Sequence, residues 1–205
     1  MKFFWLPPLG CPAFIFMNKK ELRQRFRRQL FAQALSQAGE EALKALQGWP
    51  PFQKAQCIAS YWPLPWELDI RPVNRWIWQS DKTLCLPRLH TNGHMDFYRV
   101  NGHEELVPGR FNLWEPSPQA LQVPPSKIDL ILVPCEALDA QGTRLGKGGG
   151  YYDRYLARVS CPTLAPLLPH QFSTAPLPCC IHDVPVQFYS IADEVILCER
   201  NPVNG

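Results

Sequence analysis

A glycine-rich stretch between an apolar run and a helical pattern constrains this sequence more than any other feature. Residues 141–156 read QGTRLGKGGGYYDRYL and contain five glycines. Before them, residues 128–133 are almost continuously apolar, which is typical of a strand buried on both faces. After them, apolar side chains from Tyr152 to Val159 recur at helical spacing. The sequence therefore predicts a strand, a glycine loop and a helix in succession.

Such a loop is suited to binding an anion. Glycines let the backbone approach a ligand closely, and the start of a helix offers N–H groups that have no partner. Arg144 and Lys147 place two cations inside the loop. We predict a phosphate-binding loop, although five glycines alone would also suit a sharp turn. The spacings of the Walker A loop and of the dinucleotide fingerprint are both absent.

The composition favours one globular domain. The 205 residues are enough for a substantial core, and 46% of them are hydrophobic. Apolar strands alternating with helical segments predict an α/β fold whose sheet is covered on both faces. The net charge of +3 is too small to predict binding to nucleic acid or to an anionic membrane. The eight cysteines lack zinc-site spacing, so we expect reduced thiols in a cytoplasmic protein.

Residues 1–17 are predicted to be an extension outside the core, which would span residues 18–200. Three prolines interrupt the apolar stretch of this extension, and no clean signal-peptide cleavage site follows. The stretch is also shorter than the about 20 apolar residues that cross a bilayer. Our hypothesis is that Met17 is the functional start of the protein.

Basic residues crowd the start of a helix that is predicted from Asn18 onward. Asn18 is a suitable N-cap, and Glu21 stands three residues later, where a capping box has its acid. Lys19 and Arg23 are among the cations of the first turns. Cations oppose the helix dipole at this end. A solvated basic face is the simpler interpretation, and a second phosphate-binding group is the alternative.

Three carboxylates are candidates for function. Asp153 lies in the first turn after the glycine loop, where it would suit the helix dipole or bind Mg²⁺. Asp193 follows an apolar stretch near the C-terminus and is a candidate second ligand of the same ion. Glu67 occupies a predicted strand-to-helix junction, at the kind of edge where open α/β sheets bind ligands. A solvated or capping acid is the alternative for Glu67.

The sequence DLILVPCEALDAQGTRLGKGGGYYDRYL at residues 129–156 resembles the signature of the 5-formyltetrahydrofolate cyclo-ligase family, also called methenyltetrahydrofolate synthetase. The resemblance extends from about residue 18 to residue 198. It includes KKELR at 19–23, WEP at 114–116 and DEV at 193–195, which occur in the family's order. The first 17 residues have no counterpart.

The resemblance implies a three-layer α/β/α sandwich around a mostly parallel sheet, in a single domain. It also implies an enzyme that uses ATP and Mg²⁺ to convert 5-formyltetrahydrofolate to 5,10-methenyltetrahydrofolate, with release of ADP and phosphate. A monomer acting on a small molecule is expected. Another ATP-dependent ligase or kinase on the same scaffold is one alternative. A non-catalytic folate-binding or nucleotide-binding protein is the other.

Roles for individual residues also follow from the resemblance. Arg144 and Lys147 would be the catalytic cations. Asp153 and Asp193 would bind Mg²⁺. Nucleotide contacts are expected from Lys19, Arg23, Arg144, Leu145, Gly146, Lys147, Gly148, Gly149, Gly150, Tyr151 and Tyr152. Folate contacts are expected from Glu67, Lys147, Gly148, Gly149, Gly150 and Tyr151. Candidates to stack on the pterin ring are Trp62, Trp66 and Phe111.

Overall fold

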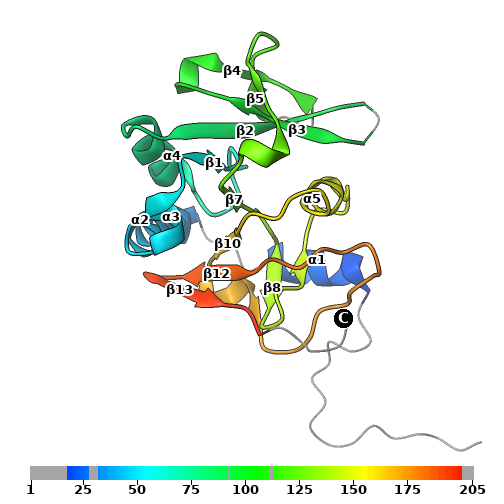
Figure 1. Ribbon diagram of the computed structural model, residues 1–205. Helices are drawn as coiled ribbons and strands as arrows, with labels where there is room; N and C mark the ends of the chain where they lie inside the picture. Colours follow the sequence, from blue (N-terminus) through cyan, green and yellow to red (C-terminus); the bar gives the residue numbers. More distant parts are fainter. Residues whose placement is uncertain (1–17, 28–31, 92, 111–112, 200–205) are drawn as a thin grey trace, which may run out of the picture.

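The computed structural model of the chain describes residues 18–27, 32–91, 93–110 and 113–199 (Figure 1). The predicted extension 1–17, Phe111 and Arg200 lie outside these residues. The helices are α1 (Lys19–Arg27), α2 (Ala32–Gln47), α3 (Pro50–Lys54), α4 (Arg71–Trp78) and α5 (Tyr151–Leu156). The strands are β1 (Cys57–Ala59), β2 (Thr83–Leu89), β3 (Met95–Arg99), β4 (Leu106–Pro108), β5 (Trp114–Pro116), β6 (Gln122–Val123), β7 (Leu130–Leu132), β8 (Ala137–Asp139), β9 (Arg144–Leu145), β10 (Thr163–Leu167), β11 (Phe172–Ser173), β12 (Phe188–Ile191) and β13 (Glu194–Leu197).

The main sheet has eight strands in the order β13-β12-β10-β7-β1-β2-β3-β6. Its five central strands, from β12 to β2, are all parallel, and the outer strands β13, β3 and β6 pair antiparallel. This arrangement confirms the predicted α/β fold around a mostly parallel sheet. The parallel strands also direct their carboxyl ends to one edge, where open α/β sheets bind ligands.

Successive residues of a central strand pack on opposite faces of the sheet. Leu130 belongs to an apolar cluster that contains side chains of α2, α3 and α4. Its neighbour Ile131 belongs to a second cluster, which contains Tyr155 and Leu156 of α5. Both strand residues have no exposed surface, because each face of the sheet is covered. The continuous apolar run in the sequence has this physical cause.

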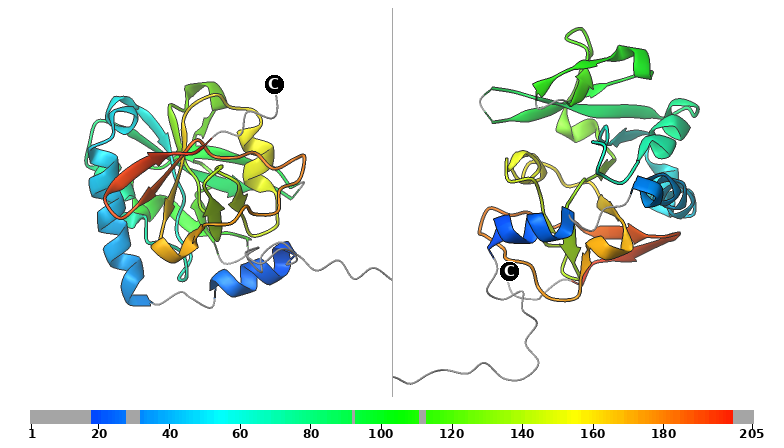
Figure 2. Two further views of the ribbon diagram at one scale, coloured as in Figure 1. Left: turned by 90° about the horizontal axis from the view of Figure 1, so that it is seen from below. Right: turned by 180° about the vertical axis from the view of Figure 1, so that it is seen from behind.

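The helix predicted from Asn18 onward is α1, which ends at Arg27, and α2 begins at Ala32. The predicted capping box is present: the Glu21 N–H donates to Asn18 Oδ1 at 3.1 Å, and the Asn18 N–H donates to Glu21 Oε2 at 3.0 Å. Leu22 and Phe26 pack against Ala137, Leu145 and Leu177. Figure 2 shows that α1 is set apart from α2, on the side of the molecule that carries α5.

The sequence had predicted that the strand β7 leads directly into the glycine loop, but in the structure it does not. A hairpin of β8 and β9 stands between them, and β11 extends it to a three-stranded sheet. Asp139 stabilises its turn by accepting hydrogen bonds from the N–H groups of Gln141 and Thr143. Gly142 has a φ of 81°, and a Cβ there would lie 2.2 Å from the carbonyl oxygen of Val186. The hairpin brings the loop into contact with α1.

A second hairpin, formed by β4 and β5, stands beyond the β2–β3 end of the main sheet (Figure 1). In the part of the chain that the structure describes, no helix is long and apolar enough to cross a bilayer. The seven cysteines of that part are free thiols, as predicted.

Candidate functional site

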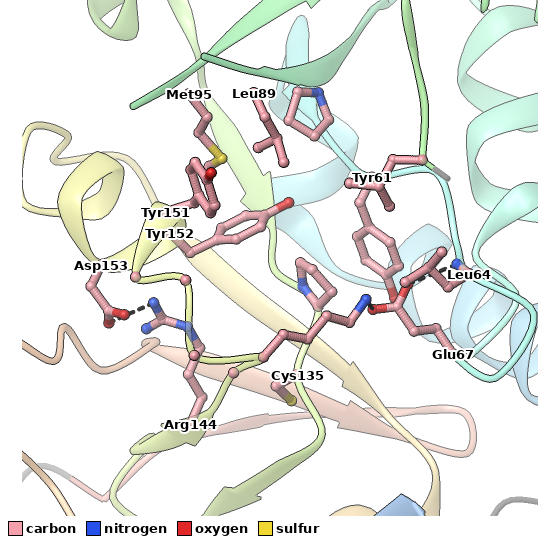
Figure 3. A pocket seen from close by; sticks show the side chains of 18 of the residues that line it. Tyr61, Leu64, Glu67, Leu89, Met95, Cys135, Arg144, Tyr151, Tyr152 and Asp153 are labelled. Carbon is pink, nitrogen blue, oxygen red and sulfur yellow. Dashed lines mark hydrogen bonds and ion pairs between the residues drawn. The ribbon is translucent and has the colours of Figure 1, made fainter. Parts of the chain in front are cut away.

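A cavity of about 590 Å³ opens beyond the carboxyl ends of β1 and β7 (Figure 3). Tyr61 and Trp62 follow β1, and Pro134 and Cys135 follow β7. The rest of its wall comes from α1, the β2–β3 hairpin, β5, the glycine loop and the segment around Asp183. Elements far apart in the sequence therefore meet at the edge of the sheet that the topology favours for ligands.

The glycine loop reaches the cavity in a backbone conformation that other residues rarely adopt. Gly148 has a φ of 95° and Gly150 has a φ of 66°, both in the left-handed region. Gly150 is also the N-cap of α5, so the loop turns directly into that helix. The guanidinium of Arg154 holds the loop by donating to the carbonyl oxygen of Gly149 at 2.6 Å. The sequence had predicted such a glycine-dependent turn into a helix.

Arg144, at the start of β9, is the most deeply buried cation of the site, with 4% of its side chain exposed. Its Nη2 donates to Asp153 Oδ1 at 2.7 Å, and its Nη1 donates to the carbonyl oxygen of Val184. The Val184 N–H donates to the same Asp153 Oδ1 at 3.1 Å. These three hydrogen bonds therefore hold the side chains of Arg144 and Asp153 and the backbone of Val184 together beside the loop.

Lys147, in the middle of the loop, forms an ion pair across the cavity. Its Nζ lies 2.5 Å from Glu67 Oε1 (Figure 3). The other oxygen of Glu67, Oε2, accepts a hydrogen bond from the Leu64 N–H at 2.8 Å. The pair links the glycine loop to the segment between β1 and α4, so two sequence-predicted site residues are direct neighbours.

The helix α1 contributes the remaining cations of the cavity. Lys19 Nζ donates to Asp183 Oδ2, and Arg23 Nε donates to the carbonyl oxygen of Gly146 at 2.6 Å. Partial burial opposes the charged form of Lys19, but the hydrogen bond to Asp183 and its charge outweigh this and raise the pKa of Lys19. Lys19 is therefore a permanent positive charge beside the loop, and the basic start of α1 is more than a solvated face.

The opposite side of the cavity is aromatic and apolar. Its rings and aliphatic chains belong to Tyr61, Trp62, Trp66, Leu89, Met95, Leu113 and Trp114. Trp66 and Trp114 are 44% and 43% exposed, which is unusual for tryptophan side chains of this size. Uncovered aromatic surface beside a cavity marks a place where a ligand gains by covering it.

Comparison with known proteins identifies the family. A sequence profile of the 5-formyltetrahydrofolate cyclo-ligase family matches residues 16–190 of this chain. The chain belongs to that family. The 5-formyltetrahydrofolate cyclo-ligase of Escherichia coli (strain K12) is 35% identical over 138 residues, which cover 66% of this chain and 75% of the relative. That of Mus musculus is 27% identical over 195 residues, which cover 91% of this chain and 94% of the relative.

A solved structure shares the fold of this cyclo-ligase family chain. The NMR structure of Aquifex aeolicus 5,10-methenyltetrahydrofolate synthetase superposes with a TM-score of 0.78 at 30% sequence identity. The match covers 92% of this chain and 97% of the other. The family resemblance predicted from the glycine-loop motif is therefore confirmed over nearly the whole chain.

Most sequence-predicted site residues of this family chain lie together. The cavity is lined by every predicted nucleotide and folate residue, by Asp153, and by Trp62 and Trp66. Asp193 is the exception. It is exposed in the turn between β12 and β13, and it is not among the described residues that line the cavity. The strand β10 separates this hairpin from β7 in the main sheet, and a shared role of Asp193 and Asp153 stays a prediction.

Three further residues of the site were not singled out from the sequence. Asp183 pairs with Lys19, Trp114 forms part of the aromatic wall, and Tyr61 stands beside Glu67. Trp114 carried a signal, since it belongs to the WEP piece of the family resemblance. Asp183 carried none, because its partner is 164 residues away.

Proposed function

We propose that this protein uses ATP to convert 5-formyltetrahydrofolate to 5,10-methenyltetrahydrofolate, with ADP and phosphate as the other products. The proposal rests on one observation above all: a cationic glycine loop and an aromatic wall face each other across a single cavity of about 590 Å³. The loop suits a triphosphate, and the wall suits a flat pterin ring. Membership of the cyclo-ligase family supports the same pairing of substrates.

The chemistry needs both substrates at the boundary between these two parts. A formyl oxygen is a poor leaving group, so ATP first transfers its terminal phosphoryl group to that oxygen. N10 of the folate then attacks the activated carbon and loses its proton to solvent, the C–O bond breaks, and phosphate leaves with the oxygen. Such a transfer asks the protein for positioning and for neutralisation of charge.

No protein nucleophile is needed for these steps. Cys135 is the cysteine that lines the cavity among the described residues, and burial raises the pKa of its thiol to about 12. It therefore remains a neutral thiol at physiological pH. Arg144 and Lys147 supply the positive charge instead, with Lys19 and Arg23 at the α1 side. Carboxylates pair with three of these cations, and phosphate oxygens would bind the same groups.

Asp153 fits the role of a Mg²⁺ ligand. It lines the cavity, 25% of its side chain is exposed, and its hydrogen bonds to Arg144 and Val184 both use Oδ1. Oδ2 is therefore the oxygen that remains for an ion. Mg²⁺ commonly takes one or two carboxylates and completes its shell with phosphate oxygens and waters. When bound, the ion would neutralise phosphate charge. The placement of Asp193 gives no support to a shared role with Asp153.

The test is a spectrophotometric assay of the purified protein with 5-formyltetrahydrofolate, Mg²⁺ and ATP. The expected result is the absorbance of the methenyl product, with one ADP released for each product formed and no product when ATP is omitted. Binding of the folate without ADP release would instead indicate a non-catalytic binding protein. ATP consumption without the methenyl product would indicate a different ligase or kinase.

A further inference from the structure

The hydroxyl group of Tyr152 is buried and has no hydrogen-bond partner among the residues that the structure describes. Tyr152 lies on α5, immediately after the glycine loop, and lines the cavity. Figure 3 shows its ring extending from the helix into the cavity, with the oxygen toward the middle. A buried hydroxyl without a partner is unfavourable, so a ligand atom that accepts its hydrogen bond would remove that cost.

A tyrosine hydroxyl ordinarily has a pKa of about 10, so it is a neutral hydrogen-bond donor at physiological pH.

The position of the hydroxyl favours the folate over the nucleotide. The cations Lys19, Arg23 and Arg144 lie on the loop side, where they would serve a triphosphate. The ring of Tyr152 instead extends toward the side that carries Tyr61 and Leu89 (Figure 3). A single neutral donor beside an apolar wall suits a polar atom on a flat heterocycle, which is rigid enough to be oriented by one hydrogen bond.

We propose that the Tyr152 hydroxyl donates a hydrogen bond to an acceptor atom on the pterin head of the folate. This bond would orient the head so that its N5-formyl group faces the glycine loop. The inference rests on the proposed function and adds a positioning role for one side chain. The backbone of Tyr152 remains available to the nucleotide at the start of α5.

The chain offers a matched control on the same helix. Tyr155 also has a buried hydroxyl without a partner among the described residues. Its ring packs against Phe97 in the core, with the ring centroids 4.9 Å apart, and it does not belong to the cavity lining. Tyr152→Phe and Tyr155→Phe thus remove the same group from the same kind of environment. Only the first faces the cavity.

The experiment compares both variants with the wild type in three measurements. These are equilibrium binding of 5-formyltetrahydrofolate by tryptophan fluorescence, the KM of each substrate, and the thermal unfolding midpoint. We expect Tyr152→Phe to weaken folate binding about tenfold. Its KM for ATP should change less than about twofold, and its unfolding midpoint should not fall, because an unsatisfied group is removed. Tyr155→Phe should bind folate like the wild type.

Three results would overturn the inference: wild-type folate affinity in Tyr152→Phe, a change confined to the KM for ATP, or an equal loss of folate affinity in Tyr155→Phe. A wild-type protein that neither binds nor converts 5-formyltetrahydrofolate would remove the proposed function, and this inference with it. A wild-type protein that converts the folate, beside a Tyr152→Phe variant that is unchanged, would remove the inference alone.

Discussion

The two sides of the cavity differ in how their side chains are paired and exposed. On the charged side, three cations already have carboxylate partners: Lys19 with Asp183, Arg144 with Asp153, and Lys147 with Glu67. On the aromatic side, two tryptophans are more than two-fifths exposed. The cations of the charged side are paired within the protein, whereas the aromatic side leaves apolar surface exposed.

This difference indicates how each side would contribute to binding. A phosphate group that enters the charged side replaces a carboxylate partner, so the net gain is smaller than the attraction of an isolated pair. It also weakens as salt is added, since part of the site is open to solvent. A ring that covers the aromatic side gains about 25 cal/mol for each Å² of apolar surface removed from water. We therefore expect orientation and catalysis from the first side, and affinity from the second.

The largest effect is expected from Arg144→Lys on the charged side. Lysine keeps the charge but has no planar fork, so it cannot hold the Val184 carbonyl and Asp153 together as Arg144 does. We expect kcat/KM to fall about 10²- to 10³-fold, as for the loss of other preorganised charge-stabilising groups. Steady-state kinetics measures this. Arg158→Lys is the control, because Arg158 is half-exposed outside the cavity and should retain wild-type kinetics. Equal activity of both variants would contradict the division of roles.

A smaller and differently distributed effect is expected from Trp114→Ala on the aromatic side. The truncation removes an exposed ring that lines the cavity, and a ligand loses that ring's contact surface. We expect the KM for the folate to rise about tenfold, by the typical worth of a buried aromatic contact, with little change in the KM for ATP. Steady-state kinetics on one preparation measures the KM for the folate and the KM for ATP. A parallel rise in the two would show that the sides do not act separately.

The smallest effect is expected from Asp183→Asn and is visible in stability. Burial opposes ionisation of Asp183, but the hydrogen bonds from Lys19 and the Cys180 N–H outweigh it and lower the pKa of Asp183. An acid with a lowered pKa stabilises the fold above its ordinary value of about 3.9, and this is lost as pH falls through the lower folded value. At pH 7 the variant should be less stable by about 0.5–1 kcal/mol.

Thermal or urea unfolding from pH 7 downward measures that difference. The gap between wild type and Asp183→Asn should persist to about pH 4 and close below it. Asp81→Asn, an exposed change in the turn before β2, should show no such pH-dependent gap. A constant gap at every pH would show that the charge of Asp183 is not its cause.

The charged side was largely predictable from the sequence because it is local. A span of ten residues contains Arg144, Lys147 and Asp153, and the glycines between them indicate a loop. The central strands were equally readable, since burial on both faces leaves a continuous apolar run such as residues 128–133. The family resemblance carried by the loop also predicted that α1 contacts the nucleotide. The basic residues of α1 alone did not decide between that role and a solvated face.

The aromatic side was predictable only in part. Trp62 and Trp66 were named as candidates, but Trp114 comes from β5, and only the arrangement of the strands brings it to the same cavity. Asp193, which is not among the described residues that line the cavity, shows what such a pattern leaves open. An acid after an apolar strand points to the functional edge of the sheet, but the pattern does not say how many strands separate it from the loop. Pairing order, which sequence periodicity does not encode, decides that distance.

The contact between Lys19 and Asp183 joins residues 164 positions apart. During synthesis on the ribosome, at about 5–20 residues per second, α1 emerges roughly 10–30 s before its acidic partner. The nascent chain therefore carries Lys19 without this partner until residue 183 has been added. Any product that stops short of Asp183 also lacks Val184, and with it the carbonyl group that holds Arg144. The contacts that hold Lys19 and Arg144 therefore form only after residue 184 has been synthesised.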